Sequence, residues 1–431
     1  MKNIISMPAL FTIMIIATMF IGGCRDKIYE EVTYTANVPV YMGFKEFRNS
    51  VKTTSPRQLI NPGKIYFKNN LLYINEQNKG IHIVDNADPA SPNIIAFIDV
   101  PGNFDLAVRG NILFADSYVD LVALDITNPV KPVELDRLKD AFPNVLPPIE
   151  NELPIAGIDF TKGVIVGWDV KEHTETVERG RRLNKQWITY DGMGVAEFAS
   201  KEVNLTSMNN GISGSMARFT ISNSYLYAVH NRVLKIFNIG KVPGMNAEDD
   251  IQLFRMAETI FPYNNKLFLG TTTGMLVYGL TNPSKPELIS TFEHINSCDP
   301  VVVQGDLAYV TLRSGTKCQG FTNQLDVVDI SSITNPTLKK SYQLFNPHGL
   351  GIDNNVLFIC DGSDGLKVYD ATDPMSIKAN QLAHFQDIRA FDVIPVNGIL
   401  MMIGADGLYQ YDYSNQDNMV LLSTIPVVID N

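Results

Sequence analysis

A five-residue pattern that recurs along the chain constrains its fold more than any other feature. The pattern is apolar and ends in Asp, and five clear copies occupy residues 81–85, 121–125, 325–329, 366–370 and 408–412. Two weaker copies, at residues 234–238 and 275–279, end in Asn and Gly instead. Neighbouring clear copies follow one another at a nearly constant spacing, as Asp85 and Asp125 do, and Asp329 and Asp370. A period of about 40 residues predicts a repeat protein with one structural unit per copy.

Each copy is one of four short strands. A second strand precedes it, as at residues 70–74; a third comes before that, as at 300–303; and a fourth follows an Asn-Pro or Asp-Pro turn, as at 287–292. Four short strands within about 40 to 45 residues are typical of a propeller blade. One such sheet cannot bury both of its faces, whereas a closed ring of sheets can. We therefore expect an all-β fold, a single β-propeller over residues 61–431.

The number of blades depends on the long interval between Asp125 and Asn238. Residues 163–168 and 187–190 read as inner strands of a degenerate unit, with residues 171–185 as a charged insertion. Seven visible copies and one degenerate copy predict eight four-stranded blades, and seven blades is the alternative if this interval is an insertion. Residues 420–427 are expected to close the ring as an outer strand or to pair with residues 33–41.

The repeats resemble the LVIVD repeat, which is named after this pentapeptide and is known from bacterial surface and exported proteins. The resemblance covers roughly residues 64–426 and implies a β-propeller that is commonly a lipoprotein. It implies no reaction and transfers no catalytic residues. We interpret the repeated Asp as a turn residue that accepts hydrogen bonds from nearby backbone N–H groups.

The N-terminus predicts export. Lys2 is followed by an apolar run that ends in Gly22-Gly23-Cys24, as in a secretory signal. Cys24 after two small residues resembles the bacterial lipobox, in which the thiol is diacylated before cleavage. We predict a lipoprotein signal peptide at residues 1–23 and a lipidated tether and N-terminal strand segment at 24–60, and a transmembrane anchor is the alternative. The protein is expected in the cell envelope, and Arg25 favours the outer membrane.

The charge balance limits the partners. A formal net charge of -11 argues against duplex nucleic acid, which needs clustered Lys and Arg. The expected partners are therefore the membrane, through the lipid on Cys24, and a glycan, peptide or protein ligand. No nucleotide or cofactor motif stands out, so no cofactor is predicted.

One rim of the ring gathers the candidate site residues. Cys298 lies just before an innermost strand and Cys318 lies in the loop after the next strand, so the oxidising exterior makes a disulfide between them plausible. A metal site with His294 is the less favoured alternative, and no metal is predicted. Asp299, Arg313, His348, Asp361 and Asp364 lie in the same loops and form the predicted ligand-binding rim.

Signs of catalysis are weak in these loops. His348 has no Ser or Cys partner at a recognisable spacing. Residues 360–365 resemble a calcium loop but lack the Glu expected at its twelfth position, so a tight turn explains them better, and Asp116 and Asp406 are expected in equivalent turns. Cys360 is expected to be a small buried residue.

The sequence favours a membrane-anchored, non-catalytic binding or scaffold propeller that presents its rim loops to an extracytoplasmic ligand. The alternative is a hydrolase or lyase that uses His348 and nearby carboxylates in the central funnel. The fold alone does not choose between them.

Overall fold

The computed structural model describes residues 29–149, 151–178, 211–293, 300–314, 322–416 and 418–428. These residues form two compact units. The larger unit contains residues 40–148, 159–167 and the described residues from 211 onward, and it holds all the pentapeptide copies. The smaller unit contains the described residues of 29–39, 149–158 and 168–178.

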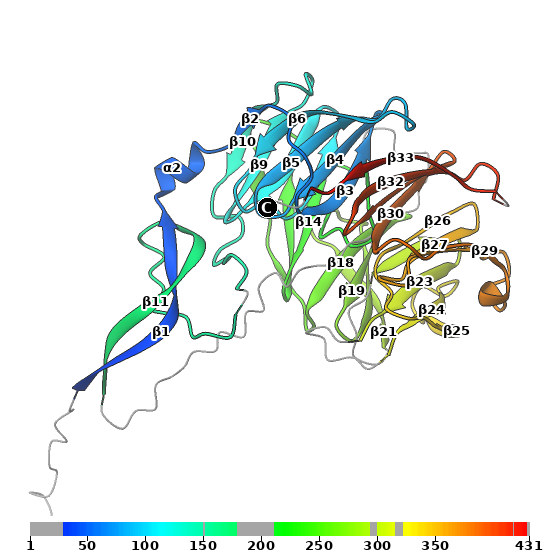
Figure 1. The fold of residues 1–431 in the computed structure, drawn as a ribbon. Coiled ribbons are helices and arrows are strands. Elements are labelled where there is room, and N and C mark those ends of the chain that lie inside the picture. The colour runs from blue at the N-terminus through cyan, green and yellow to red at the C-terminus, as the bar shows by residue number, and fades with distance from the viewer. Residues whose placement is uncertain are drawn as a thin grey trace, which may run out of the picture. The chain divides into compact units, whose positions relative to one another are not determined.

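The larger unit consists of antiparallel sheets arranged around a common axis (Figure 1). Blade 1 contains β3 (Pro62–Lys68), β4 (Leu71–Glu76), β5 (Gly80–Asp85) and β6 (Asn93–Asp99). Blade 2 contains β7 (Leu106–Arg109), β8 (Ile112–Ser117), β9 (Asp120–Asp125) and β10 (Val133–Leu138). Blade 3 contains β13 (Phe219–Ser222), β14 (Tyr225–His230) and β15 (Val233–Asn238), with β16 (Asn246–Ala247) and β17 (Ile251–Gln252) both paired to β15.

The remaining blades follow the same order. Blade 4 contains β18 (Ala257–Tyr263), β19 (Lys266–Thr271), β20 (Gly274–Gly279) and β21 (Glu287–Glu293). Blade 5 contains β22 (Val301–Gln304), β23 (Leu307–Leu312), β24 (Gln324–Asp329) and β25 (Thr337–Gln343). Blade 6 contains β26 (Leu350–Asp353), β27 (Val356–Cys360), β28 (Leu366–Asp370) and β29 (Gln381–Phe385). Blade 7 contains β30 (Ala390–Val396), β31 (Ile399–Gly404), β32 (Gly407–Asp412) and β33 (Val420–Pro426).

The innermost strands close a ring of seven blades. Each of the strands β3, β7, β13, β18, β22, β26 and β30 contacts the next, and β30 contacts β3 again. Every pentapeptide copy, weak ones included, forms the third strand of one blade. Seven blades was the alternative from the sequence, and the eighth blade that we expected is absent from the described residues.

The eighth blade was wrong because part of the long interval pairs elsewhere. Residues 163–168, which we took for an inner strand, lead into β11 (Val164–Glu178), and β11 pairs with β1 (Tyr29–Met42) in a two-stranded sheet. The described part of the charged insertion is therefore strand, and residues 187–190 lie outside the described residues. A run of β-forming residues predicts a strand but does not say which strand it pairs with.

Both faces of each blade are buried, which explains the apolar pentapeptide. Leu366 and Val368 of β28 pack with Ala390 of blade 7, whereas Tyr369 belongs to the core cluster that includes Leu344 and residues of blade 5. Successive residues of a strand point to opposite faces. Both sets of side chains are therefore apolar because each blade lies between two others.

The turns match the residue types expected of them. Between first and second strands, the pairs Asn69-Asn70, Asn264-Asn265 and Asn354-Asn355 have positive φ at both residues, from 44° to 66°. Asn tolerates this left-handed region, which two-residue hairpins of type I′ require. We name this end of the ring the turn rim, and the other end, where innermost strands begin and second strands end, the entrance rim.

The repeated Asp is a turn residue, as we interpreted it. Its side chain accepts a hydrogen bond from the backbone N–H two residues later, as in the 2.8 Å bonds from Thr127 to Asp125 and from Ser414 to Asp412. Side-chain and backbone hydrogen bonds within these turns also lower the pKa of both carboxyl groups. These carboxylates therefore stabilise the turn rim.

Blades 1 and 7 close the ring by side-chain and backbone bonds. The amide side chains of Asn86 and Gln410 exchange two hydrogen bonds, of 2.9 and 2.7 Å, and Gln410 is fully buried. Leu59 forms a parallel bridge with Val427 and accepts a 2.8 Å hydrogen bond from the N–H of Val428. Of our two expectations for residues 420–427, the outer strand is confirmed, and residues 33–41 pair with β11 instead.

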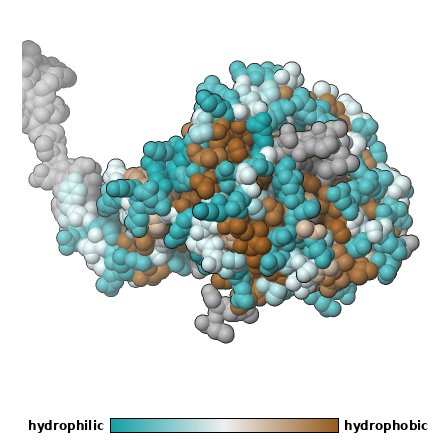
Figure 2. Space-filling model, turned by 90° about the horizontal axis from the view of Figure 1, so that it is seen from above, coloured by the Kyte–Doolittle hydropathy of each residue, from teal (hydrophilic) through white to brown (hydrophobic). Residues whose placement is uncertain are grey.

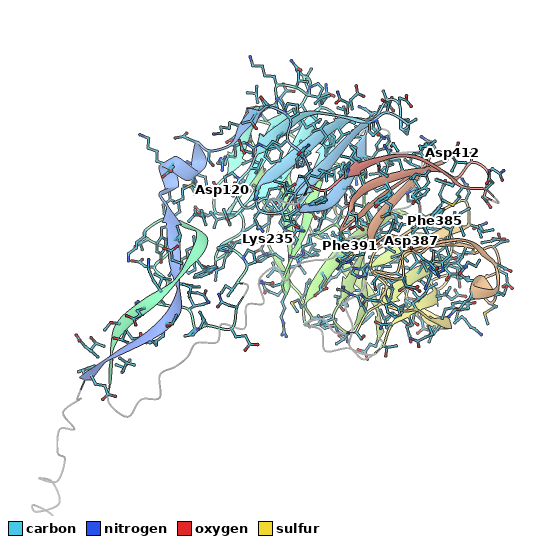
Figure 3. All side chains as sticks on the ribbon, viewed as in Figure 1. Asp120, Lys235, Phe385, Asp387, Phe391 and Asp412 are labelled. Atoms are coloured by element: carbon cyan, nitrogen blue, oxygen red, sulfur yellow. The ribbon has the colours of Figure 1, made fainter. Side chains whose placement is uncertain are left out.

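Residues 44–54, which precede blade 1 and which we name the strap, contact both blade 1 and blade 2. β2 (Lys52–Thr54) adds to β6, and the short helix α2 (Phe44–Arg48) places Arg48 2.9 Å from Asp120 of blade 2 (Figure 3). Asp120 is fully buried and also pairs with Arg137 at 3.1 Å. The strap thus covers the edge of blade 1, which would otherwise expose unpaired backbone groups.

The smaller unit is held by polar contacts. Thr33 and Thr174 lie 2.8 Å apart at their hydroxyl oxygens, and the Tyr34 hydroxyl donates to Glu175 at 3.0 Å. Asn37 exchanges amide hydrogen bonds with Asn151. A two-stranded sheet with so little apolar burial has marginal stability alone.

Apolar residues on the visible face of the molecule lie in separate patches among hydrophilic ones (Figure 2). Outer strands contribute exposed apolar side chains, including Val133, Leu288 and Leu338, each at least 45% exposed. An outer strand has a neighbouring strand on one side only, so partial exposure there needs no functional explanation.

Candidate functional site

The structure brings together the described members of the predicted rim. Arg313 follows β23, His348 precedes β26, and Asp361 and Asp364 lie in the turn after β27, all on the entrance rim of blades 5 and 6. The other predicted residues, Asp299 of the rim and Cys298 and Cys318 of the disulfide, lie outside the described residues, as does Cys24.

His348 is buried and held firmly. Its backbone N–H donates to the carbonyl of Cys360 at 2.7 Å, its carbonyl accepts from the Thr311 hydroxyl at 2.7 Å, and its ring lies 5.3 Å from that of Phe391. The Arg313 guanidinium lies 3.5 Å from both ring nitrogens. Burial, with the charges of Arg313 and Arg389, lowers the pKa of His348 well below its usual value, so the imidazole is neutral.

Asp361 is buried and fully engaged. Its carboxylate accepts the backbone N–H groups of Phe345 and Asn346, the latter at 2.7 Å, and its second oxygen lies 2.5 Å from Nζ of Lys367. Lys367 also pairs with Asp364. Burial lowers the pKa of Lys367, but the hydrogen bonds that its ammonium group donates to both carboxylates outweigh this effect and raise that pKa overall. Asp361 therefore anchors the loop that carries His348.

The same anchoring carboxylate recurs in two other blades. Glu76 at the end of β4 accepts the backbone N–H groups of Ile60 and Asn61, and Asp116 in β8 accepts those of Phe104 and Asp105. Each joins the end of the second strand to the segment before the innermost strand. The hydrogen bonds of Asp361 therefore belong to the structure of the repeat and are not special to the predicted rim.

A side chain at a fixed offset along the chain decides which side-chain partner this carboxylate has. Glu76 lies 3.0 Å from the ring of His82, and Asp361 pairs with Lys367, whereas the corresponding residue after Asp116 is Val122. His82, Val122 and Lys367 all occupy the second position of the pentapeptide. Asp116 is therefore the member of this set without a hydrogen-bonding side chain at that position.

The thiol of Cys360 is buried. Cys360 is fully buried, and burial raises its pKa well above the usual value. Thiolates are the reactive form of cysteine, so this residue acts as a small apolar side chain, as predicted.

The channel between the innermost strands is filled near blade 1. A segment of residues 211–217, which we name the central segment, includes β12 (Ile212–Ser213), and β12 pairs with β3 on its inner side. At its start, the Gly211 N–H donates to Val108 of blade 2 at 3.0 Å. The sequence did not predict this strand, because its two residues carry no repeat signal.

The central segment then reaches further blades. The Ser215 hydroxyl accepts the N–H of Leu350 in blade 6 at 3.2 Å, and Met216 packs against Phe391 in the innermost strand of blade 7. The Ala217 carbonyl accepts the N–H of Ile260 in blade 4 at 2.9 Å. These contacts occupy the place where an open funnel would lie.

A small cleft opens between blades 2 and 3 on the entrance rim, with a volume of about 20 Å³. Asp105, Asp116, Arg218 and His230 line it together with the aromatic rings of Phe104, Tyr118, Phe142 and Phe219. Burial raises the pKa of Asp116 to about 7 although Asp105 and Phe104 donate to it. Burial and the nearby Arg218 lower the pKa of His230 to about 4.

Charges around the cleft are paired across three blades. Nζ of Lys64 in blade 1 lies 2.8 Å from Asp105, which also accepts the backbone N–H groups of Arg218 and Phe219. Lys64 and Arg218 both lie over the ring of Phe104, each 4.7 Å from its centroid. These residues were missed in the sequence because Arg218 and Asp105 are far apart along the chain and no motif connects them.

Within the part of the chain that the structure describes, no group of three His, Cys, Asp or Glu residues is placed to hold a metal ion. No helix among the described residues is long and apolar enough to span a membrane.

The sequence matches the LVIVD repeat over residues 63–100, 104–140 and 297–343, within blades 1, 2 and 5. The chain carries LVIVD repeats in a β-propeller. No curated protein matches it. The position of each LVIVD pentapeptide as the third strand of a blade explains its regular spacing.

The solved structures that the chain matches share little of its sequence. A protein from Lactobacillus plantarum is 11% identical, with a TM-score of 0.55, over 85% of this chain and 97% of that chain. The computationally designed protein Ika8 is 12% identical, with a TM-score of 0.47 over 92% of this chain and 93% of that one. Hsv2 of Kluyveromyces lactis is 12% identical, with a TM-score of 0.45 over 85% of this chain and all of that one. At these identities the likeness to the Lactobacillus plantarum protein concerns the fold alone.

Proposed function

We propose that this protein is a lipid-anchored, non-catalytic binding propeller of the cell envelope that presents its entrance rim to an extracytoplasmic glycan, peptide or protein. The observation that carries the proposal is the filled channel: the central segment contacts blades 1, 2, 4, 6 and 7 where an active-site funnel would need space. Ligand access is then from the rim.

The rim offers exposed aromatic side chains for recognition, one of them on a loop held by Asp361. Asp361, Glu76 and Asp116 hold the segments before the innermost strands by paired backbone hydrogen bonds. Exposed Phe345 and Phe254 lie on the same rim, 59% and 54% exposed. Loops fixed in this way lose little conformational entropy on binding.

The anchor is tested by labelling cells that make the protein with a radioactive or clickable fatty acid. Wild type should incorporate the label and sediment with membranes, and Cys24→Ser should do neither, because the acyl acceptor is lost. An unlabelled wild-type protein would reject the lipid anchor.

Binding is tested with the purified wild type on glycan and peptide arrays. A ligand should bind saturably and be recovered unchanged after long incubation. Phe345→Ser and Phe254→Ser should weaken its binding, and Leu338→Ser on an outer strand is the matched control, being 51% exposed. Conversion of the ligand to product by the wild type would contradict a non-catalytic role.

A further inference from the structure

In the smaller unit, one edge of the strand β11 is uncovered by the described part of the chain. β11 pairs with β1, and the two strands form a long ribbon (Figure 1). Among the described residues, no strand pairs with the other edge of β11. An edge strand presents a row of backbone N–H and C=O groups to which a further strand can add, and a two-stranded sheet has marginal stability alone. The addition of a strand to β11 is therefore favoured.

The outer edge of β1, by contrast, is already in use. Asn37 of β1 forms a parallel bridge with Ile155. Its N–H donates to the carbonyl of Pro154 at 2.8 Å, and its carbonyl accepts the N–H of Ala156 at 3.0 Å. A further strand is therefore expected on β11 and not on β1.

Contacts within the ribbon define how β11 presents its side chains. The hydroxyl oxygens of Thr33 and Thr174 lie 2.8 Å apart, and the ring of Tyr34 lies 5.8 Å from that of His173. The Tyr34 hydroxyl also donates to Glu175 at 3.0 Å. Residues two apart in a strand share a face. His173 and Glu175 therefore lie on the face of the ribbon that Tyr34 occupies.

The charges of β11 around His173 are self-complementary. Lys171 lies two residues before His173, and Glu175 lies two residues after it. If two copies of β11 pair antiparallel about a two-fold axis at His173, Lys171 of each copy faces Glu175 of the other. Opposite charges that face each other across two strands stabilise the pairing, and like charges destabilise it. This edge is therefore matched in charge to a second copy of itself.

Neighbouring registers lack this match. An axis at Lys171, Glu172 or Glu175 places that residue opposite the identical charge of the other copy. An axis at Thr174 places Lys171 opposite an apolar residue. Of the registers centred on residues 171 to 175, only the one centred on His173 brings a lysine opposite a glutamate.

Lys171 is accessible for such a contact. Its side chain is 55% exposed, and its Nζ lies 3.1 Å from Asp169 of the same strand, which is 59% exposed. An exposed pair of this kind contributes little free energy, so Lys171 can turn to another carboxylate at little cost. Val170 beside it is 54% exposed and would be partly covered by a second strand.

We propose that β11 pairs antiparallel with β11 of a second copy of this chain, about a two-fold axis at His173. The product is a four-stranded sheet in the order β1-β11-β11-β1. The backbone groups of the two edges bond to each other, and two pairs of Lys171 with Glu175 of the other copy set the register. The inference concerns the smaller unit and does not rest on ligand binding at the entrance rim.

The first test exchanges the charges. The full-length lipoprotein is studied by sedimentation velocity in detergent, with micelles in large excess over protein so that two copies do not share a micelle by chance. The wild type should form a dimer whose fraction rises with protein concentration. Lys171→Glu and Glu175→Lys should each weaken self-association about tenfold or more, because each places like charges opposite each other twice.

Mixing the two variants is the decisive measurement. Lys171→Glu carries acidic side chains at both positions and Glu175→Lys carries basic ones, so the mixed pair again has two contacts of opposite charge. The mixture should recover association, which would also show that both variants are folded. Lys162→Glu, at a residue that is 63% exposed and lies outside β11, is the control and should associate as the wild type does.

A cysteine on the axis gives a second measurement. Residues that face each other across antiparallel strands have Cα atoms about 4.5 to 5.5 Å apart, which suits a disulfide. His173→Cys should therefore form a disulfide between two copies on mild oxidation. Thr35→Cys, on the exposed part of β1, is the matched control and should not exceed the wild type.

The outcomes separate this proposal from the proposed function. A wild type that stays monomeric, with no disulfide between copies of His173→Cys, overturns the proposal. Self-association that both charge variants leave unchanged overturns the β11 edge as the contact, and two variants that stay apart when mixed overturn the register. These results leave the proposed function standing, because the binding arrays decide it separately.

Discussion

Asp116 and Asp361 occupy the same place in blades 2 and 6 but have different surroundings. Both are buried and both accept two backbone N–H groups from the segment before an innermost strand. Asp361 has Lys367 at 2.5 Å, whereas Asp116 has Val122 at that point of the repeat and burial raises its pKa to about 7. The repeat thus uses one carboxylate for structure in both blades, and the blade without the cation has the carboxyl group that titrates near neutral pH.

The largest loss of stability is expected from removing the charge of Asp361, which is paired with Lys367. Asp361→Asn leaves the buried Lys367 with Asp364 alone, so the free energy of unfolding should fall by about 3 to 5 kcal/mol. Urea unfolding at pH 7 measures it. A loss below about 1 kcal/mol would mean that Asp364 alone satisfies Lys367 and that the two carboxylates are not the contrasting pair described above.

The corresponding substitution in blade 2, Asp116→Asn, should raise the free energy of unfolding relative to wild type at high pH, whereas Asp361→Asn lowers it. The pKa of folded Asp116, about 7, lies above the ordinary Asp value, so the folded state holds a proton that the unfolded chain releases. The stability from this group is complete below the pKa of the unfolded chain and is lost as the pH rises from there through 7. Asp116→Asn removes that loss, so its stability relative to wild type should rise by about 3 kcal/mol between pH 5 and pH 8.

This pH effect is measured as the difference between two urea titrations. The charged and titratable groups around Asp116 are Asp105, Lys64, Arg218 and His230, and they remain in both proteins. Below pH 6.5, protonation of His230 destabilises the fold, because its pKa is lowered to about 4, and this contribution cancels in the difference. A difference that is constant from pH 5 to pH 8 would show that Asp116 is ionised throughout.

Removing Lys367 instead of Asp361 should make the surroundings of Asp361 in blade 6 resemble those of Asp116 in blade 2. Lys367→Met keeps the side-chain length but leaves the carboxylate of Asp361 with backbone donors alone. We expect a loss of about 2 kcal/mol at pH 7, because backbone N–H groups still satisfy part of the buried charge. Urea unfolding at pH 7 measures the loss. A loss below about 0.5 kcal/mol would mean that the backbone N–H groups alone satisfy Asp361.

The smallest loss of stability is expected from a substitution in blade 1, Glu76→Gln. Burial raises the pKa of Glu76, but the hydrogen bonds from His82, Asn61 and Ile60 outweigh it and lower that pKa overall. Glu76→Gln keeps one acceptor oxygen, for the N–H of Asn61, and leaves the N–H of Ile60 facing an amide donor, so it should lower the free energy of unfolding by about 1 kcal/mol at pH 7. Thermal unfolding checks it, with exposed Lys79 changed to Gln as a neighbouring control. A larger loss than for Asp361→Asn would reverse the order of the series.

Much of the fold was predictable from the chain because the repeat is local. The pentapeptide spacing located the third strand of every blade. Local signals failed at the long interval, where β11 has strand-forming residues like those of any blade but pairs with β1. Pairing between segments so distant in the sequence depends on the whole chain.

The candidate site was predictable in part. Strand order placed Arg313, His348, Asp361 and Asp364 on one rim, and the structure finds them there. Arg218 and Phe142 went unnoticed because their meeting with Asp116 depends on the stacking of blade 3 on blade 2. The constant offset between Glu76 and His82, and between Asp361 and Lys367, is the signal that would have singled out Asp116.

The sequence by itself determined the strands, the turns and the identity of the repeat, since these depend on residue types within a few positions of one another. Only the tertiary structure decided the number of blades, the path of the central segment through the channel and the burial of Asp116 beside a cleft. Those features depend on which sheets stack on each other, and stacking is fixed by the closure of the ring and not by any single repeat.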